Sequence, residues 1–395
     1  MLEFNTIHNI NCLEGLKLLP DNSIDSIVTD PPYELGFMGK SWDSTGIAYN
    51  IELWKECLRV LKHGGHLLAF GGTRTYHRMA CAIEDAGFEI RDQIQWIYGS
   101  GFPKSMNISK AIDKKLGAER EVIGIGKGAG KNPKGLKYDD DKQSGGHLKN
   151  EYDLTIPKTT EAKQWEGWGT ALKPANEPIV VARKPLSEKT VAENVLKWGT
   201  GGINIDDCRV EYDMTDTNPA TNPLYRKKNG YKTNYGIDSN PSAYTLKKQE
   251  GTMNINNQGR FPANVIFDEE AGKLLDEQSG ISKSSGSGYN FETSKLHFND
   301  SGGASRFFYV AKASKKERGE GNNHPTVKPV SLIKYLVTLV TPPDGVCFDP
   351  FMGSGTTAIA CINTNRNYIG FEIDKDYYNL AQKRIDGVKS QIRFA

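Results

Sequence analysis

The 395-residue sequence lacks several features that would place it in common classes of protein. No stretch approaches the roughly 20 apolar residues that a membrane-spanning helix needs. The first residues show no basic segment followed by an apolar run, so we expect no secretory signal. The six cysteines are scattered, and no two of them have Cys-x-x-Cys spacing. This usage fits a reducing interior better than a disulfide framework, and we expect a soluble, cytoplasmic protein with no membrane partner.

The chain also lacks an excess of charge of either sign. Its 50 lysines and arginines oppose 48 aspartates and glutamates, which gives a formal net charge of +2. Because this balance gives no global indication of a polyanionic partner, a nucleic-acid site has to come from a local basic patch. The candidate patches are residues 96–137 and the cluster of Lys312, Lys315, Lys316 and Arg318. A hydrophobic fraction of 37% with 10% aromatics excludes a wholly disordered or collagen-like chain.

Both ends of the chain alternate short apolar segments with segments of helical periodicity. In the first 100 residues the pattern predicts strands at 24–29, 66–70 and 89–98, and helices at 51–62 and 73–86. From about residue 325 it predicts helices at 330–340, 356–364 and 375–385, and strands at 346–348 and 368–371. Such alternation is typical of an α/β fold, a doubly wound and mostly parallel sheet with helices on both faces.

The middle of the chain has a different composition. Between about 100 and 320 it is rich in Gly, Lys, Asn and Ser, and only the islands 179–182 and 307–310 are typical of core strands. A loop-rich insert of this length is uncommon as a mere connection, which favours a functional module. The sequence therefore divides into residues 1–100, an insert over 101–304, and residues 305–395.

A turn with chemical character follows the first predicted strand, namely Asp30-Pro31-Pro32-Tyr33. A purely structural interpretation stays open, because Pro-Pro ends strands and a preceding Asp can cap the turn. The chemical interpretation starts from the prolines, which fix φ and lack N–H groups, so that the turn is rigid and presents carbonyl acceptors. With Asp30 it can accept hydrogen bonds from both hydrogens of an exocyclic amine. Tyr33 adds a flat face on which a planar base can stack.

A second turn joins a predicted strand to a predicted helix, with the sequence Asp349-Pro350-Phe351-Met352-Gly353-Ser354-Gly355-Thr356-Thr357. Glycines at such a junction let a ligand approach backbone N–H groups. Glu372 ends the next predicted strand, about 20 positions on, where an acidic residue is the usual partner of ribose hydroxyls. The loop lacks both the Lys of an ATPase-type phosphate loop and the full G-x-G-x-x-G spacing of dinucleotide-binding folds. An adenosyl ligand without phosphates fits better.

Together the two turns resemble those of the amino-methyltransferases that modify exocyclic amines of DNA bases with S-adenosylmethionine. The catalytic turn of that family is (D/N/S)-P-P-(Y/F/W), and its cofactor loop is F-x-G-x-G, matched here by residues 351–355. The catalytic turn precedes the cofactor loop, which is the circularly permuted order of the family's β group. That group's H-P-T-x-K-P segment is similar to residues 324–329. The resemblance covers about residues 1–100 and 305–390 and implies the Rossmann-like methyltransferase fold.

The resemblance implies a role for each matching residue. Asp30, Pro31, Pro32 and Tyr33 form the catalytic turn, in which Asp30 and the Pro31 carbonyl hold the target amine and Tyr33 stacks on the extruded base. The implied cofactor-binding residues are Asn11, Asp349, Phe351, Gly353, Gly355, Thr356, Glu372, Thr326 and Lys328.

Three of these cofactor-binding roles are more specific. Glu372 is expected on the ribose, and Thr326 and Lys328 at the methionine end of the cofactor. Asn11 stands where relatives often carry an Asp near the adenine, within a Gly-Asp-Cys segment that here reads Ile-Asn-Cys. An amide can still pair with an adenine edge.

The implied activity is methyl transfer from S-adenosylmethionine to the exocyclic amine of a flipped base in double-stranded DNA. N6 of adenine is favoured because the turn begins with Asp, whereas Ser at that place is more associated with cytosine. Residues 1–100 would be the catalytic half of the methyltransferase domain, 305–395 its cofactor-binding half, and 101–304 a target-recognition insert.

Alternatives stay open at this point. They are N4-cytosine methylation, methylation of RNA or of a protein amide, and a sequence-specific DNA-binding protein that has lost catalysis. Relatives also leave open a homodimer and a restriction endonuclease partner.

Two further patterns concern metals and aromatics. Cys57, His63 and His66 offer too few ligands for zinc, and amine methylation needs no metal, so we expect no metal site. Trp96, Tyr98 and Phe102 either pack as strand residues or form a second wall of the base pocket.

Overall fold

The computed structural model describes residues 2–35, 45–99, 101, 105–127, 151–210, 260–283, 301–311 and 327–393. These residues form two compact units. The smaller unit lies within residues 100–175, and the larger one holds the rest of the described chain. Thr326, Phe102 and the expected basic cluster at 312–318 lie outside the described residues.

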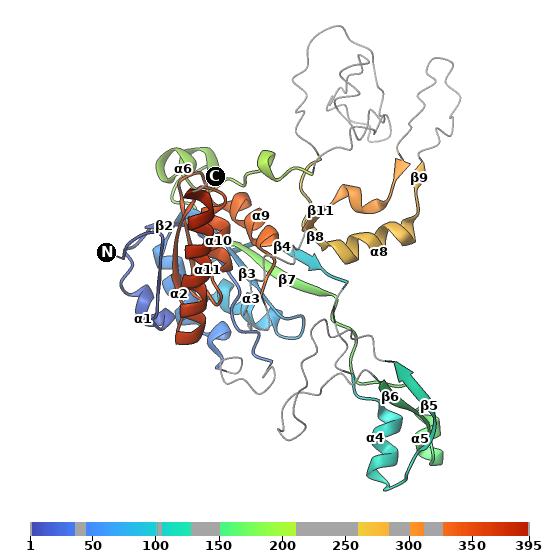
Figure 1. Cartoon of the computed structure of the whole chain (residues 1–395). Helices are drawn as coiled ribbons and strands as arrows, with labels where there is room; N and C mark the ends of the chain where they lie inside the picture. Colours follow the sequence, from blue (N-terminus) through green and yellow to red (C-terminus); the bar gives the residue numbers. More distant parts are fainter. Residues whose placement is uncertain are drawn as a thin grey trace, which may run out of the picture. The chain divides into compact units, whose positions relative to one another are not determined.

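The larger unit is built on a sheet of nine described strands, in the order β1-β13-β12-β2-β3-β7-β4-β8-β11 (Figure 1). The strands are β1 Thr6–His8, β2 Ile24–Thr29, β3 Leu61–Phe70, β4 Glu89–Ile97, β7 Asn176–Arg183, β8 Val265–Asp268, β11 Tyr309–Ala311, β12 Val346–Asp349 and β13 Asn367–Phe371. Every neighbouring pair is parallel except the two that involve β7, which runs antiparallel to β3 and to β4. The expected mostly parallel α/β sheet is confirmed.

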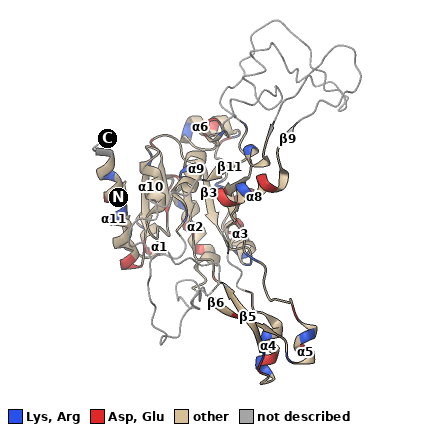
Figure 2. Ribbon diagram, turned by 45° about the vertical axis from the view of Figure 1, so that its right-hand side comes forward, with Lys and Arg blue, Asp and Glu red and all other residues tan. Residues whose placement is uncertain are grey.

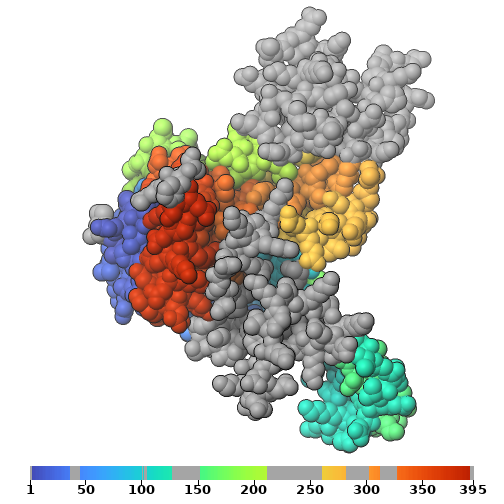
Figure 3. Space-filling view, viewed as in Figure 1, coloured from blue at the N-terminus to red at the C-terminus, as the bar shows by residue number. Residues whose placement is uncertain are grey.

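Helices cover both faces of this sheet. Successive strand residues point to opposite sides, and in the central strands both sides are apolar, so that two core clusters form. One core cluster contains Ile27 and Leu67 and packs beneath the N-terminal helices. The other contains Val28 and Leu68 and packs beneath the C-terminal helices. The first group is α1 Cys12–Leu16, α2 Ile51–Val60 and α3 Tyr76–Asp85; the second is α9 Val330–Val340, α10 Thr356–Ile362 and α11 Lys375–Arg393. The sheet is therefore doubly wound, and the two ends of the chain lie side by side (Figure 3).

Shorter elements complete the larger unit. They are α6 Val191–Trp198, α8 Glu269–Ser279, the 3-10 helices η3 Ile47–Tyr49, η4 Asp206–Cys208 and η5 Ala304–Phe307, and the strands β9 Ser282–Lys283 and β10 Ser301–Gly302.

Most expected elements occur within a few residues of their predicted bounds, with one informative difference at β3. The helix predicted at 51–62 ends at Val60, and the strand predicted at 66–70 begins earlier, at Leu61, so that Gly64 and Gly65 lie inside β3. A Cβ on Gly65 would lie 2.8 Å from the carbonyl oxygen of Asp25 on β2. The glycine is thus needed for the close approach of two strands.

The smaller unit combines a β-hairpin with two helices. Its elements are α4 Ile108–Lys115, β5 Glu121–Lys127, β6 Glu151–Ile156 and α5 Thr160–Gln164. The Asp113 carboxylate is fully buried and accepts hydrogen bonds from the Lys158 and Thr159 amides, the Thr159 hydroxyl and Arg120. Burial alone would raise the pKa of Asp113, but these donors outweigh it and lower the pKa to about 2.

The bounds of this unit differ from those of the expected insert over 101–304. The unit ends at Ala175, and the next segment enters the large sheet as β7. β8 and β11 extend the same sheet beyond β4. Within the part of the chain that the structure describes, no helix combines the length and apolarity that crossing a bilayer takes.

Candidate active site

The expected catalytic turn lies at the edge of the sheet where the parallel strands end. Asp30 directly follows β2, and Phe70 ends the neighbouring strand β3. Because β7 runs antiparallel to β3, its first residues reach this same edge. Phe70 pairs in register with Ile179, and Glu177 stands two positions earlier on β7. Side chains from three neighbouring strands therefore meet here.

A buried lysine joins two carboxylates at this edge. Lys328, two residues before α9, places its Nζ 2.7 Å from Asp30 Oδ2 and 3.1 Å from Glu177 Oε2. The Lys328 side chain is only 6% exposed, against 26% for Asp30 and 18% for Glu177. Burial alone would lower the pKa of Lys328, but the two carboxylates outweigh burial and raise it. We call Asp30, Lys328 and Glu177 the charge cluster; with both acids ionised its net charge is −1.

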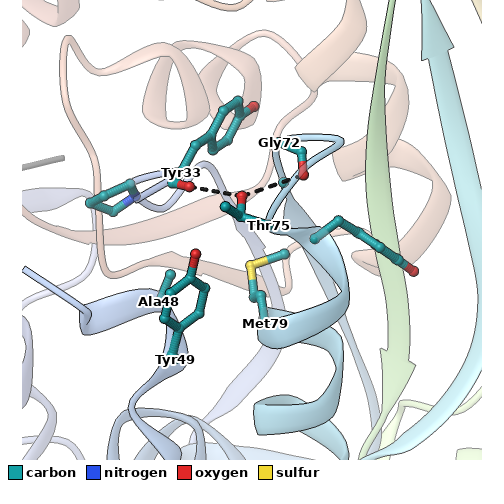
Figure 4. A pocket seen from close by; sticks show the side chains of 9 residues that line it. Tyr33, Ala48, Tyr49, Gly72, Thr75 and Met79 are labelled. Atoms are coloured by element: carbon teal, nitrogen blue, oxygen red, sulfur yellow. Dashed lines mark hydrogen bonds between the residues drawn. The ribbon is translucent and has the colours of Figure 1, made fainter. Parts of the chain in front are cut away.

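Tyr33 is held in this cluster at both of its ends. Its hydroxyl donates a hydrogen bond of 2.7 Å to Glu177 Oε2, and its backbone carbonyl accepts one of 2.8 Å from the Thr75 hydroxyl (Figure 4). The Lys328 ammonium lies 5.2 Å from the centre of its ring. Burial, together with the charges of Asp30 and Glu177, raises the pKa of Tyr33, so the phenol stays protonated.

One oxygen of the Asp30 carboxylate accepts no hydrogen bond from the residues that the structure describes. This atom is Oδ1, and it is buried. A buried acceptor without a donor is costly, so this atom is suited to receive an N–H group from a ligand. Pro31 beside it is buried and has no N–H to compete.

A small hollow lies behind the turn, on the side of α3 (Figure 4). Its lining is largely aromatic or small, which suits the close packing of a rigid turn. The lining residues are Pro32, Tyr33, Ala48, Tyr49, Gly71, Gly72, Thr75, Tyr76 and Met79.

The two described members of the expected aromatic wall differ in burial. Trp96 on β4 is 9% exposed and belongs to the core, which favours strand packing. Tyr98 is half-buried, with its ring centre 5.1 Å from that of Trp96. Burial, with a contribution from the charge of Glu177, raises the pKa of Tyr98 to about 12.

The second turn begins at Asp349, whose carboxylate is 2% exposed and fully engaged by the protein. Oδ1 accepts hydrogen bonds from the Thr29 hydroxyl at 2.7 Å and the Phe351 amide at 3.0 Å, and Oδ2 accepts one from the Thr357 hydroxyl at 2.7 Å. Burial nevertheless raises the pKa of Asp349 to about 6. Through these hydrogen bonds the Asp349 side chain holds the loop in place.

Two glycines let the loop fold back on the sheet. Gly353 and Gly355 have φ of +52° and +83°, in the left-handed region that favours glycine. A Cβ on Gly355 would lie 3.0 Å from the Cβ of Ala381 on α11. The Met352 amide donates to the Phe371 carbonyl at 2.8 Å, which fixes the loop to the end of β13.

Glu372 follows β13 and reaches the loop. Its Oε2 accepts a hydrogen bond of 2.7 Å from the Gly353 amide, and its Oε1 accepts one of 2.8 Å from the Asp374 amide. The residue is 8% exposed, and burial raises the pKa of Glu372 to about 7. The loop and the expected ribose acid thus form one hydrogen-bonded assembly.

This assembly fits an adenosyl group. Each Glu372 oxygen keeps a second lone pair for a ribose hydroxyl. Hydroxyl donors would also favour the ionised carboxylate, which burial now disfavours. No phosphate is required, since the described site is acidic where a phosphate loop would be basic.

The remaining expected cofactor residues that the structure describes are Asn11, Phe351, Thr356 and Lys328. Asn11 caps α1 by accepting a hydrogen bond of 2.9 Å from the Leu13 amide. Phe351 is half-buried against the core. Thr356 begins α10 and is 8% exposed. The methionine-end role of Lys328 stays a prediction, while its ammonium contacts Asp30 and Glu177.

Three side chains that bond to residues of the two turns or to Lys328 were missed by sequence reasoning: Glu177, Thr29 and Thr75. Glu177 carried a weak signal, as an acid at the start of the apolar island 179–182. The sequence gives no indication that this island runs antiparallel and so brings the acid to Asp30.

Comparison with known proteins places this geometry in a family. The chain belongs to the N6/N4 DNA methylase family, whose profile, described as DNA methylase, matches residues 24–383. It is therefore a DNA methyltransferase of the N6-adenine/N4-cytosine class, and its cofactor is S-adenosylmethionine.

Similar proteins differ in how much of this chain they match and in the base that their names give. The type II methyltransferase M.HindIII of Haemophilus influenzae is 21% identical over 96% of this chain and 94% of its own length. The DNA adenine methyltransferase YhdJ of Escherichia coli is 39% identical over 17% of this chain and 23% of its own. The solved PvuII DNA methyltransferase (cytosine-N4-specific) aligns with 99% of this chain and 92% of its own at 13% identity, with a TM-score of 0.42.

Part of the expected basic patch at 96–137 is visible on the smaller unit. Lys110, Lys114 and Lys115 are exposed and lie on the single helix α4, which carries blue segments in Figure 2. They form a local group of positive charge in a chain that is nearly neutral as a whole.

Proposed function

We propose that this protein methylates N6 of a flipped adenine in double-stranded DNA. The observation that carries the proposal is the Asp30 carboxylate. Its Oδ2 is occupied by Lys328, and its buried Oδ1 has no donor among the described residues. Together with the Pro31 carbonyl, Oδ1 offers two acceptors for the two hydrogens of an amine.

The chemistry requires this arrangement. The exocyclic amine is conjugated with its ring and is a poor nucleophile. Acceptors on both hydrogens draw it toward a tetrahedral geometry with a usable lone pair, and they act most strongly in the transition state. When bound, S-adenosylmethionine supplies a methyl group already activated as a sulfonium. Positioning of the amine therefore matters more than acid–base catalysis.

The base has to leave the duplex to reach Asp30, at a cost of a few kcal/mol. Tyr33 is prepared to offset part of that cost by stacking, because Glu177 and Thr75 fix its hydroxyl and its backbone. A ring that is already ordered loses little entropy when the base arrives.

The choice of adenine rests on the first residue of the turn. Similar proteins include both an adenine and a cytosine-N4 enzyme, so similarity alone does not choose between the bases. In the family that the sequence resembles, Asp at this place is associated with adenine more than Ser is. N4-cytosine methylation is the second candidate.

The cofactor-binding roles belong to the same proposal. Phe351, Gly353, Gly355 and Thr356 line the pocket, and Glu372 holds the ribose. Asn11 lies toward the adenine. Asp349 acts by fixing the loop, since its oxygens serve Thr29, Thr357 and the Phe351 amide. We expect Glu372→Ala to weaken S-adenosylmethionine binding in calorimetry; unchanged affinity would remove Glu372 from the ribose role.

The insert over 101–304 is proposed to recognise the target sequence, with the exposed lysines of α4 as contacts to phosphate. A DNA-binding protein that has lost catalysis is the alternative from another class. The complete turn, with its tyrosine and aspartate both held in place, argues against it.

The test is to incubate the purified protein with methyl-labelled S-adenosylmethionine and mixed-sequence duplex DNA, with RNA in parallel. Hydrolysis to nucleosides and mass spectrometry then identify the labelled base. We expect N6-methyladenine from DNA. N4-methylcytosine would replace the proposed base, and cofactor binding without label in any nucleic acid would favour the lapsed enzyme.

A further inference from the structure

We propose that Glu177 is a positioning residue for methyl transfer, which shares Lys328 with Asp30 and keeps the charge cluster at a net −1 beside the target amine. The inference rests on the proposed amine chemistry but not on the choice of base. Glu177 belongs to neither of the two turns: it lies 144 residues after Tyr33 and 172 residues before Asp349.

The contacts of Glu177 connect the two working parts of the turn. Its Oε2 lies 3.1 Å from the Lys328 ammonium and 2.7 Å from the Tyr33 hydroxyl. A single oxygen thus holds both the cation that binds Asp30 and the ring on which the base stacks. Without the Glu177 carboxylate, Asp30 would be the one remaining acid paired with the Lys328 ammonium in the charge cluster.

The backbone fixes Glu177 before any ligand arrives. Its neighbour Pro178 accepts a hydrogen bond of 2.9 Å from the Gly71 amide at the end of β3. On its other side Glu177 pairs in register with Trp96 on β4. Because strands hold the residue from both sides, the side chain projects from a rigid base.

The charge argument follows the course of the reaction. As the N–C bond forms, the C–S bond breaks and its electron pair stays on sulfur, so positive charge passes to the amine nitrogen, which then releases a proton to water. Asp30 and Lys328 alone sum to zero, and an ammonium 2.7 Å from the carboxylate would offset its attraction for that nitrogen. Glu177 restores a net negative charge where positive charge develops.

The experiment measures single-turnover methyl incorporation into mixed-sequence DNA at saturating cofactor. The variants are Glu177→Gln, Glu177→Asp, Lys328→Met and the double variant E177Q/K328M. Glu89→Gln is the matched control, because Glu89 pairs with Arg183 at the far end of β7. Glutamine keeps the shape of Glu177 and an acceptor for Tyr33 but loses the charge.

We expect E177Q to slow transfer roughly tenfold or more with cofactor affinity within about twofold of the parent, E177D to retain more activity, and E89Q to match the parent. The double variant should be faster than E177Q, because Asp30 alone restores a net −1. A purely structural role predicts the opposite order. Parental rates from E177Q, or a double variant slower than E177Q, would overturn the proposal.

Two outcomes separate this inference from the proposed function. A parent enzyme that labels no nucleic acid contradicts the proposed function, whereas an active parent with an equally active E177Q contradicts only the role of Glu177. If E177Q does not fold, K328M and E177Q/K328M carry the test. Because Glu177 is proposed to act by offsetting Lys328, its loss should change the rate little once Lys328 is absent, and a double variant tenfold slower than K328M would refute the charge argument.

Discussion

The hydroxyl of Thr29 donates a hydrogen bond of 2.7 Å to Asp349 Oδ1. Thr29 is the last residue of β2, directly before the catalytic turn, and Asp349 is the last residue of β12, where the cofactor loop begins. Both side chains are almost fully buried. One hydrogen bond therefore joins the two halves of the site at the point where each leaves the sheet.

We expect Thr29→Val to lower the free energy of unfolding by about 1.5–3 kcal/mol, because it removes a buried hydrogen bond to a charged acceptor while preserving shape. Urea denaturation measures this change. Thr6→Val is the control, since the Thr6 hydroxyl bonds the Phe4 carbonyl in an exposed position at 3.3 Å. Equal stability of the two variants would contradict a structural role for the Thr29–Asp349 bond.

The raised pKa of Glu372 predicts a dependence of stability on pH. Burial raises it from 4.5 to about 7, so the native state binds more protons than the unfolded state between these values. Stability contributed by the protonated form is thus lost as pH rises from about 4.5 to about 7. Glu372→Gln should flatten this loss.

The comparison uses urea unfolding of the ligand-free protein at about pH 5 and about pH 7.5. Glu52→Gln, at a side chain 71% exposed on α2, should keep the parental dependence. Asp349 contributes in the same direction over lower pH, because burial raises its pKa from 3.8 to about 6. A parental slope in E372Q would show that Glu372 is not the titrating group.

Gly355→Ala tests the close approach of the cofactor loop to α11. Gly355 and Gly199 both have positive φ, but a Cβ on Gly355 would press on Ala381, whereas one on Gly199 would meet nothing within 4 Å. Gly199→Ala should cost about 1 kcal/mol of stability from backbone strain alone. Gly355→Ala should cost more and also weaken S-adenosylmethionine binding in calorimetry. Equal effects of the two changes would mean that the contact with α11 is unimportant.

Asp30→Asn removes the charge of the acceptor but retains its size. We expect single-turnover transfer to fall by about 10²–10³, as for other acceptors and donors that act in a transition state, with cofactor affinity unchanged. Asp21→Asn is the control, because Asp21 forms an exposed ion pair with Arg59. Comparable rates from the Asp30 variant and the parent would exclude the catalytic role.

The sequence predicted those parts of the site that are contiguous in the chain. Asp30-Pro31-Pro32-Tyr33 and the loop from Asp349 are short segments whose residue types follow from the ligands proposed for them. Their flanking strands are apolar enough to be recognised, so β2 and β12 were also expected nearly in place. Glu372 was found because its spacing from the loop follows from one helix and one strand.

Contacts between distant segments could not be predicted in this way. Glu177 reaches Asp30 only because β7 enters the sheet antiparallel, and the apolar island that forms β7 has the same pattern for either direction. Lys328 was expected at the cofactor on the strength of its motif, a role that stays a prediction, and its contacts with Asp30 and Glu177 were not expected. Pairing of charges in three dimensions leaves no periodic trace in the sequence.

The order of strands has a consequence for the nascent chain. β12 lies between β2 and β13, and β1 pairs with β13. The strands β1 and β2 are therefore synthesised long before the strands β12 and β13 with which they pair. About 320 residues separate Thr29 from Asp349, which at roughly 5–20 residues per second takes about 16–64 s of translation. During that interval the open edge of β2 is a site for mispairing. The site is therefore complete only after β12 has been synthesised and has paired with β2.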